Sequence, residues 1–332
     1  MTISPDHQAQ PHKIVRPQAA LLYDMELPLR QVFYPLGFPV EILTNAPLVL
    51  EAAAESFGHM RLLRKVKALQ IRIGVTDSES PQQPPEPTRR EYNHLYTLVA
   101  DTENQAILDL SRHTCFVWLN RSALTSRLYL RYNFLEKVVY LLLGAAAVTD
   151  LHAACVGQHG KGILLCGDSG AGKSTLSYAC ARAGWTYTSD DTSYLVNRSR
   201  VPRVIGHAHR VRFRPAAKEL FPELEHRQIT PRMEGKASIE VPIAELGGHI
   251  HTSVETKISA IVYLNRYASA QSKLVRLPEH SATERMSNEL FSAGEIRAKH
   301  ERILERLAFV PTYELHYSGL NEAITQLGTL TR

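Results

Sequence analysis

The feature that most constrains this chain is the nine-residue segment 167–175, with the sequence GDSGAGKST. It matches the phosphate-binding pattern G-x-x-x-x-G-K-[ST] at every fixed position. Glycines in this pattern let consecutive backbone N–H groups turn inward around a phosphate chain, the lysine supplies charge for the outer phosphates, and the next hydroxyl is placed to ligate Mg²⁺. The segment therefore predicts a nucleotide site. Its expected contacts are Gly167, Asp168, Ser169, Gly170, Ala171, Gly172, Lys173, Ser174 and Thr175.

The residues on either side of this segment have the pattern that such a site needs. Residues 162–166 form a short apolar run, which is typical of a buried strand. Residues 174–182 are typical of a helix that stops at Gly184. A helix that begins at the phosphate loop adds further N–H groups and a favourable dipole. The competing interpretation is a degenerate loop that binds only a stray anion.

Two further features lie at informative distances from the loop lysine. Asp190 and Asp191 follow residues 185–189, which are predicted to form the next strand, and Asp190 comes 17 residues after Lys173. His152 comes 21 residues before Lys173, at the start of another apolar run. One helix and one tight turn would therefore deliver an aspartate to the loop. The structural alternatives are an ordinary strand-to-loop turn for the aspartates and a core position for the histidine.

This order of early histidine, phosphate loop and tandem aspartate resembles the HPr kinase/phosphorylase family and its looser relatives, over about residues 150 to 265. Those proteins share a core with phosphoenolpyruvate carboxykinase. The resemblance implies an α/β P-loop kinase core that uses ATP and Mg²⁺. It also implies that Ser174 and Asp190 are metal ligands, that Lys173 offsets charge on the transferring group, that Asp191 is the base for the acceptor hydroxyl, and that His152 orients or tunes an aspartate.

The chain also departs from that family's pattern. A second signature, rich in glycine and arginine and containing a metal-side glutamate, is not found, and Glu219 and Glu234 are out of register with it. The arginine expected before the late core strand falls near Lys257, which keeps the charge but not the bidentate fork. The resemblance is therefore to a relative of HPr kinases, and neither HPr as a substrate nor the reverse phosphorylase reaction is expected.

The first part of the chain shows no catalytic constellation. We expect a disordered tail over residues 1–13, a smaller accessory α+β domain over 14–145, and the catalytic domain over 146–332. Within the accessory domain, a capping-type residue ahead of Pro47 predicts a helix that ends near Gly58. Other expected elements are strands at 69–75, 95–100, 106–109 and 114–119, a proline-rich loop at 77–88 and a long helix at 127–143.

Beyond the tandem aspartate, residues 204–215 contain three arginines at alternate positions. If this stretch is extended, Arg210, Arg212 and Arg214 lie on one face of a strand. Three guanidinium groups on one face could hold phosphates or an acidic substrate. The alternative is a solvated strand face. Lys257 is a further candidate for contact with the substrate or with phosphate.

Composition limits the remaining choices. The four cysteines have no paired spacing, which favours buried free thiols in a cytoplasmic protein. There is no run of eighteen apolar residues, so no membrane contact is expected. A net charge of +5 suits ATP or an acidic partner, and no nucleic-acid binding is expected from it.

The leading hypothesis is a Mg²⁺- and ATP-dependent kinase that phosphorylates a hydroxyl, with serine favoured, on a protein or peptide. The alternatives are a nucleotide-binding regulatory or scaffold protein with little turnover, and a small-molecule kinase. A GTPase is disfavoured because no N-K-x-D motif is present. The resembled family forms oligomers, so a homo-oligomer is a further expectation.

Overall fold

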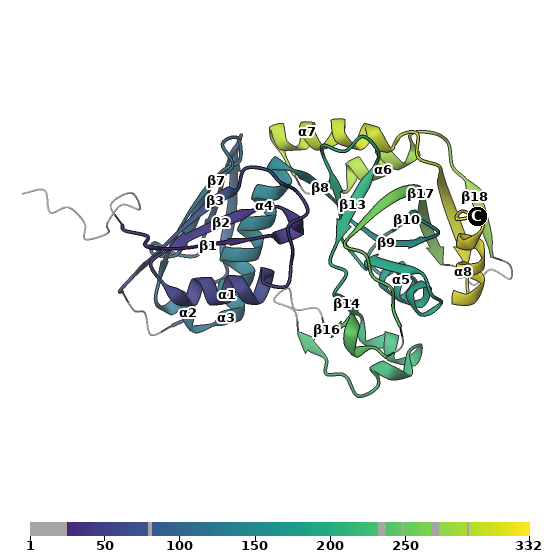
Figure 1. The fold of residues 1–332 in the computed structure, drawn as a ribbon, viewed down its shortest axis with the longest axis horizontal. Coiled ribbons are helices and arrows are strands. Elements are labelled where there is room, and N and C mark those ends of the chain that lie inside the picture. Colours follow the sequence, from purple (N-terminus) through teal and green to yellow (C-terminus); the bar gives the residue numbers. More distant parts are fainter. Residues whose placement is uncertain (1–24, 79–81, 232–236, 248, 267–271, 291) are drawn as a thin grey trace, which may run out of the picture.

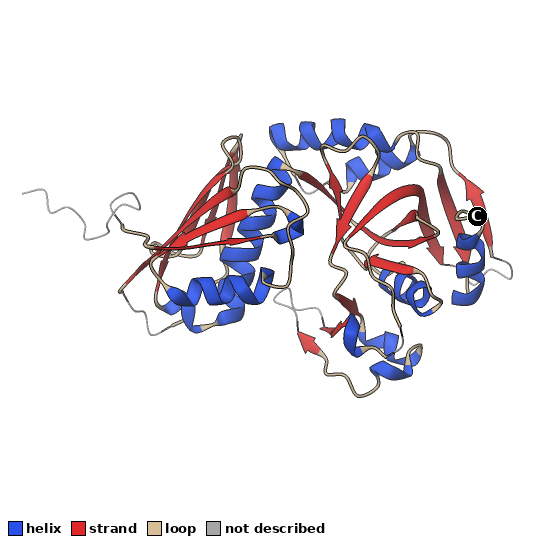
Figure 2. Cartoon of the chain, in the orientation of Figure 1, coloured by secondary structure: helices blue, strands red, loops and turns tan. Residues whose placement is uncertain are grey.

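The computed structural model describes residues 25–78, 82–231, 237–247, 249–266, 272–290 and 292–332. The expected disordered tail at 1–13 and Glu234 lie outside these residues. The described chain forms two lobes, each built around a sheet, and the chain order runs from one lobe to the other (Figure 1). The fold is of the mixed α/β kind, with helices and strands in both lobes (Figure 2).

The first lobe is a seven-stranded sheet with helices on one face. Its strand order is β1-β2-β3-β7-β6-β5-β4, with parallel pairing of β2 with β3 and of β3 with β7, and antiparallel pairing elsewhere. Buried and more exposed residues alternate along β5 and β6, as expected where one face packs on a core. The strands are β1 (Leu29–Phe33), β2 (Val40–Thr44), β3 (Leu69–Thr76), β4 (Thr88–Tyr92), β5 (Leu95–Val99), β6 (Gln105–Asp109) and β7 (Thr114–Asn120).

The expected helix after Thr44 is present as α1 (Pro47–Phe57), but its expected cap is wrong. The residue at the cap position is Ala46, and no side chain caps the helix. Asn45 is used differently: its side chain donates to the carbonyl of Val75 at 2.8 Å and accepts the N–H of Val75 at 2.9 Å. These two bonds tie the start of α1 to the end of β3, which the local sequence pattern could not reveal.

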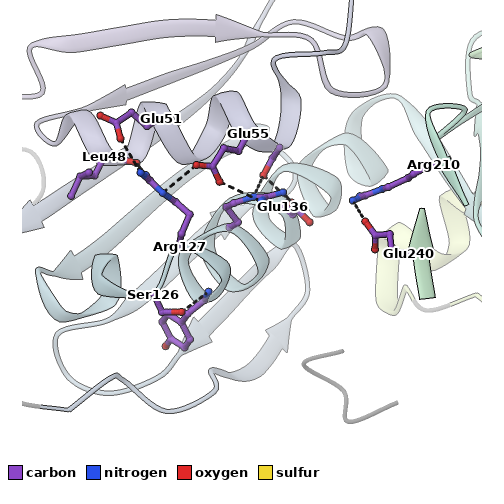
Figure 3. Close-up of polar contacts among 11 residues, drawn as sticks. Leu48, Glu51, Glu55, Ser126, Arg127, Glu136, Arg210 and Glu240 are labelled. Atoms are coloured by element: carbon purple, nitrogen blue, oxygen red, sulfur yellow. Dashed lines mark hydrogen bonds and ion pairs between the residues drawn. The ribbon is translucent and has the colours of Figure 1, made fainter. Parts of the chain in front are cut away.

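The expected long helix near residues 127–143 is present as three consecutive helical segments after the short α2 (Ser122–Thr125): α3 (Arg127–Leu130), a π-helical stretch (Arg131–Glu136) and α4 (Lys137–Ala146). Arg127 holds α3 to α1 through the Leu48 carbonyl and the Glu51 carboxylate (Figure 3). The side chain of Ser126 caps α3 by accepting the N–H of Tyr129. The helices therefore form one layer against the sheet.

The second lobe is built on a nine-stranded mixed sheet. Its main order is β11-β9-β10-β17-β13-β12-β8, and β19 pairs with β17 and β18. The three strands β10, β17 and β19 run parallel. The strands are β8 (Val148–Leu151), β9 (Ala153–Gln158), β10 (Lys161–Cys166), β11 (Thr186–Ser189), β12 (Ser193–Val196), β13 (Arg203–Gly206), β17 (Glu255–Arg266), β18 (Lys273–Arg276) and β19 (Thr312–Tyr317).

Alternate residues of β10 face two different helical layers. Ile163 and Leu165 join the core of α5 (Lys173–Arg182) and α8 (Leu320–Gly328). Leu164 and Cys166 join the core of α6 (Ser281–Asn288) and α7 (Gly294–Leu304). The strand is thus buried on both faces, which explains why its sequence is a continuous apolar run.

A small third sheet packs beside α5. It has the order β14-β16-β15, formed by β14 (Arg210–Phe213), β16 (Ala237–Pro242) and β15 (Thr230–Pro231). Phe213 of β14 and Tyr178 of α5 share its core. Short 3-10 turns complete the described chain at Pro35–Gly37, Pro215–Glu219, Pro222–Leu224, Ile243–Glu245 and Glu305–Leu307.

Two results bear on the expectations for the whole chain. All four cysteines are buried free thiols, and burial raises the pKa of Cys155 to about 12. Among the described helices, none has the length and apolar character needed to cross a membrane. The boundary expected at residue 145 stays a prediction. Val196 and Ile205 come after this boundary in the sequence, yet they pack in the core of the first lobe.

Candidate functional site

The glycine-rich loop, defined as Gly167–Gly172, connects β10 to α5 with a backbone that only glycine adopts easily. Gly167, Gly170 and Gly172 have φ values of 143°, 100° and 99°. Gly172 is also closely approached, since a Cβ there would lie 2.8 Å from the Tyr317 hydroxyl. That hydroxyl donates to the Ala171 carbonyl at 3.2 Å. The end of β19 therefore fixes the shape of the loop.

Lys173 begins α5 and its side chain turns back under the loop. Only 5% of the residue is exposed, and burial lowers the pKa of its amine. The Nζ atom donates to the carbonyls of Gly167 at 2.6 Å and Asp168 at 3.2 Å. It also lies 2.9 Å from Nε2 of His152. In this structure the carbonyls of the loop itself therefore accept hydrogen bonds from the Lys173 amine.

His152, in the short connection between β8 and β9, joins Lys173 to Asp191. Because Lys173 donates to Nε2, we assign the ring proton to Nδ1, and Nδ1 lies 3.7 Å from Oδ1 of Asp191. Burial first, and then the charge of Lys173, lowers the pKa of His152, which favours the neutral ring. The side chain of Asp191 is 42% exposed, so another molecule can reach it. Three separated segments thus form one chain of contacts.

Asp190 faces different partners from its neighbour. Its Oδ2 accepts the backbone N–H of Arg212 in β14 at 2.7 Å, and its backbone carbonyl accepts the Ser174 hydroxyl at 3.3 Å. Burial raises the pKa of the Asp190 carboxyl to about 6. The two aspartates therefore face different partners: the carboxylate of Asp190 faces β14 and its backbone carbonyl faces Ser174, whereas the carboxylate of Asp191 faces His152.

The raised pKa of Asp190 gives a test of stability. Replacing Asp190 by Asn should stabilise the nucleotide-free protein at pH 8, because Asn keeps an oxygen for the Arg212 N–H and carries no charge to desolvate. A pKa unit is worth about 1.36 kcal/mol, and partial exposure reduces the effect, so we expect a gain of about 1–2 kcal/mol.

The pH dependence of this gain follows from the direction of the shift. The folded state binds the proton more tightly than the unfolded state, so the wild type loses stability as the pH rises from about 4 to about 6. Urea unfolding of both proteins measures the difference at pH 8 and near pH 4. The gain should vanish at the lower pH, and an equal difference at both values would contradict this explanation.

The donors near the loop suit a hard cation that shares its ligands with phosphate and water. Ser174 and Asp190 meet through the hydroxyl and the backbone carbonyl. Among the described residues there is no group of three or more His, Cys, Asp or Glu that could hold a metal ion on its own. Mg²⁺ is commonly bound by one or two protein oxygens together with substrate phosphates and waters. The residues present fit that type of site.

The three arginines expected on one face have two different roles in the structure. Arg210 and Arg212 each pair with Glu240 of β16 at 2.6 Å, so both guanidinium groups are already engaged by one carboxylate. Arg214 donates to the Ser169 hydroxyl of the glycine-rich loop at 2.8 Å. Of the three, Arg214 alone touches the loop. Sequence reasoning missed Glu240, because only the pairing of β14 with β16 places it opposite Arg212.

Lys257 requires a correction. It precedes Ile258, which is aligned with Gly162 near the start of β10. The glycine-rich loop follows the other end of that strand, at Cys166. The register of the parallel pair therefore separates Lys257 from the loop by nearly the length of β10. We do not retain it as a phosphate contact.

Two residues near the loop carried no signal in the sequence. Tyr317 reaches the loop from β19, which the parallel pairing with β17 brings alongside. Glu289 follows α6 and borders a small pocket together with His152 and Cys166. Burial raises the pKa of Glu289, while the charge of Lys173 opposes that shift. Both residues come from segments more than one hundred residues after the loop, so no local pattern could identify them.

A cavity of about 540 Å³ begins at the loop and extends along α5 toward the connection between β19 and α8. Its walls combine apolar side chains with a few polar ones. Residues that define its ends and polar groups are Gly172, Thr175, Arg182, Phe221, Arg266 and Asn321. Ligand sites for small molecules commonly have this size and this mixture.

Comparisons with known proteins add little to this geometry. No protein-family model matches the chain, and no curated protein matches it in sequence. Among solved structures, the HPr(Ser) kinase/phosphatase from Coxiella burnetii is a distant neighbour with a TM-score of 0.28 and 10% sequence identity. The match covers 54% of this chain and 88% of that one. At this level of similarity, the neighbour's activity does not transfer to this chain.

Proposed function

We propose that this protein is a Mg²⁺- and ATP-dependent kinase that transfers the γ-phosphate to a hydroxyl, preferably of serine, on a protein or peptide. The observation that carries the proposal is the chain of contacts from Lys173 through His152 to Asp191. A protein that only binds a nucleotide needs the lysine, but it has no use for an exposed carboxylate that lies 3.7 Å from the histidine contacted by that lysine.

The nucleotide would occupy two adjoining parts of the molecule. Its phosphates would lie on the N–H groups of the glycine-rich loop and the start of α5, where the helix dipole favours negative charge. Its nucleoside would lie in the cavity of about 540 Å³ that begins at Gly172 and Thr175. For Lys173 to contact the outer phosphates, its Nζ must leave the carbonyls of Gly167 and Asp168.

The protein side chains would then divide the work of phosphoryl transfer. Asp191 accepts the proton of the acceptor hydroxyl, and His152 keeps that carboxylate oriented. Lys173, which bonds to the Gly167 carbonyl, and Arg214, which bonds to the Ser169 hydroxyl, offset negative charge on the transferring group. Ser174 and Asp190 would hold Mg²⁺, which when bound supplies charge neutralisation between the phosphates.

The presence of the first lobe favours a protein or peptide acceptor over a small molecule. The first lobe adds more than one hundred residues to the chain but none to the contacts around the glycine-rich loop described above. We propose that it recognises the acceptor or forms a homo-oligomer in the cytoplasm. A small-molecule acceptor would leave this lobe without a role in the reaction.

The test is transfer of label from γ-labelled ATP to proteins and peptides of a cell extract, with Mg²⁺ present. Lys173→Met serves as the control, because it removes the charge and keeps an apolar stem of similar length. We expect a labelled acceptor with the wild type and at least about 10²-fold less label with the variant. ATP binding by the wild type without transfer to any acceptor would overturn the kinase and leave a nucleotide-binding regulator. Label only on small metabolites would indicate a small-molecule kinase.

A further inference from the structure

The segment between α1 and β3, residues 60–68, has no regular secondary structure but is firmly held. The N–H groups of Leu63 and Arg64 both donate to the Gly37 carbonyl, at 2.8 and 3.0 Å. The contact is so close that a Cβ on Gly37 would lie 2.5 Å from the side chain of Leu63. The side chains of this segment are therefore presented from a fixed backbone.

The outward side chains of this segment are basic and apolar in alternation. Arg61, Lys65 and Lys67 are exposed cations. Between them, Leu62 and Val66 are 41% and 55% exposed. Apolar side chains at such exposure, set among cations on a fixed backbone, favour a partner that is both acidic and partly apolar.

Arg64 of the same segment connects this surface to the second lobe. Its Nη2 lies 2.6 Å from Oε1 of Glu255, at the start of β17, and the same oxygen lies 3.8 Å from Nη1 of Arg203 in β13. One carboxylate is thus shared by two guanidinium groups from different lobes. Next to them, Lys257 lies directly opposite Arg203 in the antiparallel pair of β13 and β17.

The resulting surface has an excess of positive charge. Like charges directly opposite each other in a sheet repel, and the single carboxylate of Glu255 offsets only one of the positive charges gathered here. Within the part of the chain that the structure describes, the ion pairs include none formed by Arg61, Lys65, Lys67 or Lys257. We call these four residues, together with Arg64 and Arg203, the interlobe basic surface.

Two histidines near this surface are held in the neutral form. His59 precedes Arg61 by two residues, and its ring packs against that of His209 with centroids 4.0 Å apart. Burial lowers the pKa of both rings, that of His209 to about 4, and the charge of Arg210 lowers both further. These histidines therefore add no charge at neutral pH, and the surface owes its charge to lysine and arginine.

We propose that the interlobe basic surface docks an acidic, partly apolar segment of the peptide or protein acceptor, and this proposal rests on the kinase function proposed above. A single-stranded nucleic acid is disfavoured because none of the six residues that define the surface is aromatic, so none of them can stack on a base. A membrane is disfavoured because the segment is not an amphipathic helix.

The position of the surface predicts the layout of the acceptor. Lys257 lies beside the start of β10, and the glycine-rich loop follows its end. A strand rises about 3.3 Å per residue, so the six residues of β10 span roughly 20 Å. An extended acceptor would therefore need at least about five residues between its acidic segment and the hydroxyl that is phosphorylated.

The test measures binding separately from transfer. The probe is a fluorescein-labelled 12-residue peptide in which glutamate alternates with leucine and serine, and fluorescence anisotropy is read with the full chain and without nucleotide. The test variant carries Arg61→Glu, Lys65→Glu and Lys67→Glu. The control carries Arg90→Glu, Arg112→Glu and Lys273→Glu, which changes the net charge equally at exposed positions elsewhere.

We expect the test variant to bind the probe at least about tenfold more weakly and the control to stay within about twofold. Lys257→Glu alone should also weaken binding, because the second lobe contributes to the surface. Equal losses in the test and control variants, or no binding by the wild type, would overturn the proposal. So would tighter, surface-dependent binding of an oligonucleotide or of anionic vesicles. Lys173→Met should bind the probe normally, so failure of the kinase function and failure of the docking surface are distinguishable.

Discussion

Replacing Asp191 by Asn should lower the rate of phosphoryl transfer by about 10³-fold, which is the usual contribution of a positioned general base. Asparagine keeps the oxygen that faces Nδ1 of His152, so the contacts of His152 and Lys173 should survive. What is lost is the ability to accept a proton from the acceptor. ATP affinity should stay within about threefold, since Asp191 does not touch the glycine-rich loop.

Asp150→Asn is the matched control for this variant. Asp150 lies in β8 and borders the same small pocket as His152. Its replacement therefore removes the same charge from the same region of the molecule. Single-turnover transfer from γ-labelled ATP measures the chemical step, and titration with ATP measures binding. A wild-type rate in Asp191→Asn, or an equal loss in both variants, would remove Asp191 from the role of base.

Local patterns in the sequence predicted the elements around the site well. The strand before Gly167, the helix that begins at Lys173 and the strand before Asp190 are all present with nearly the expected bounds. Each of these depends on residues that are close in sequence: an apolar run, glycines with positive φ, and a turn of aspartates. Interactions within one element and its neighbours are the kind that periodicity and turn chemistry report.

The parts that could not be predicted depend on pairing between distant strands. Glu240 pairs with both Arg210 and Arg212 because β16 lies beside β14 in one particular register, and a different register would have left both guanidinium groups without this carboxylate. Lys257 was expected as a phosphate contact because its position along β17 relative to β10 was unknown. A shift of register moves every side chain of a strand, and nothing in a single strand's sequence states its partner.

Gly172→Ala should weaken nucleotide binding more than any other single change in the loop that adds only a methyl group. The residue has a φ of 99°, and its new Cβ would lie 2.8 Å from the Tyr317 hydroxyl. Left-handed backbone costs a non-glycine residue about 1–2 kcal/mol. Relief of the clash requires either Tyr317 or the loop to move, and the hydroxyl of Tyr317 is bonded to the Ala171 carbonyl. We expect ATP affinity to fall by at least about 10²-fold.

Gly184→Ala separates strain from the effect on the site. Gly184 follows the other end of α5 with a φ of 86°, and a Cβ there meets nothing within 4 Å. Both variants should lose about 1–2 kcal/mol of stability to backbone strain, but Gly184→Ala should bind ATP normally. Adding Tyr317→Phe to Gly172→Ala removes the clashing oxygen and should restore part of the affinity, because the two changes act on one contact. Calorimetric titration with ATP and urea unfolding measure both quantities. Normal ATP affinity in a folded Gly172→Ala protein would mean that the nucleotide does not lie on this loop, and both the proposed phosphate site and the kinase function would then be wrong.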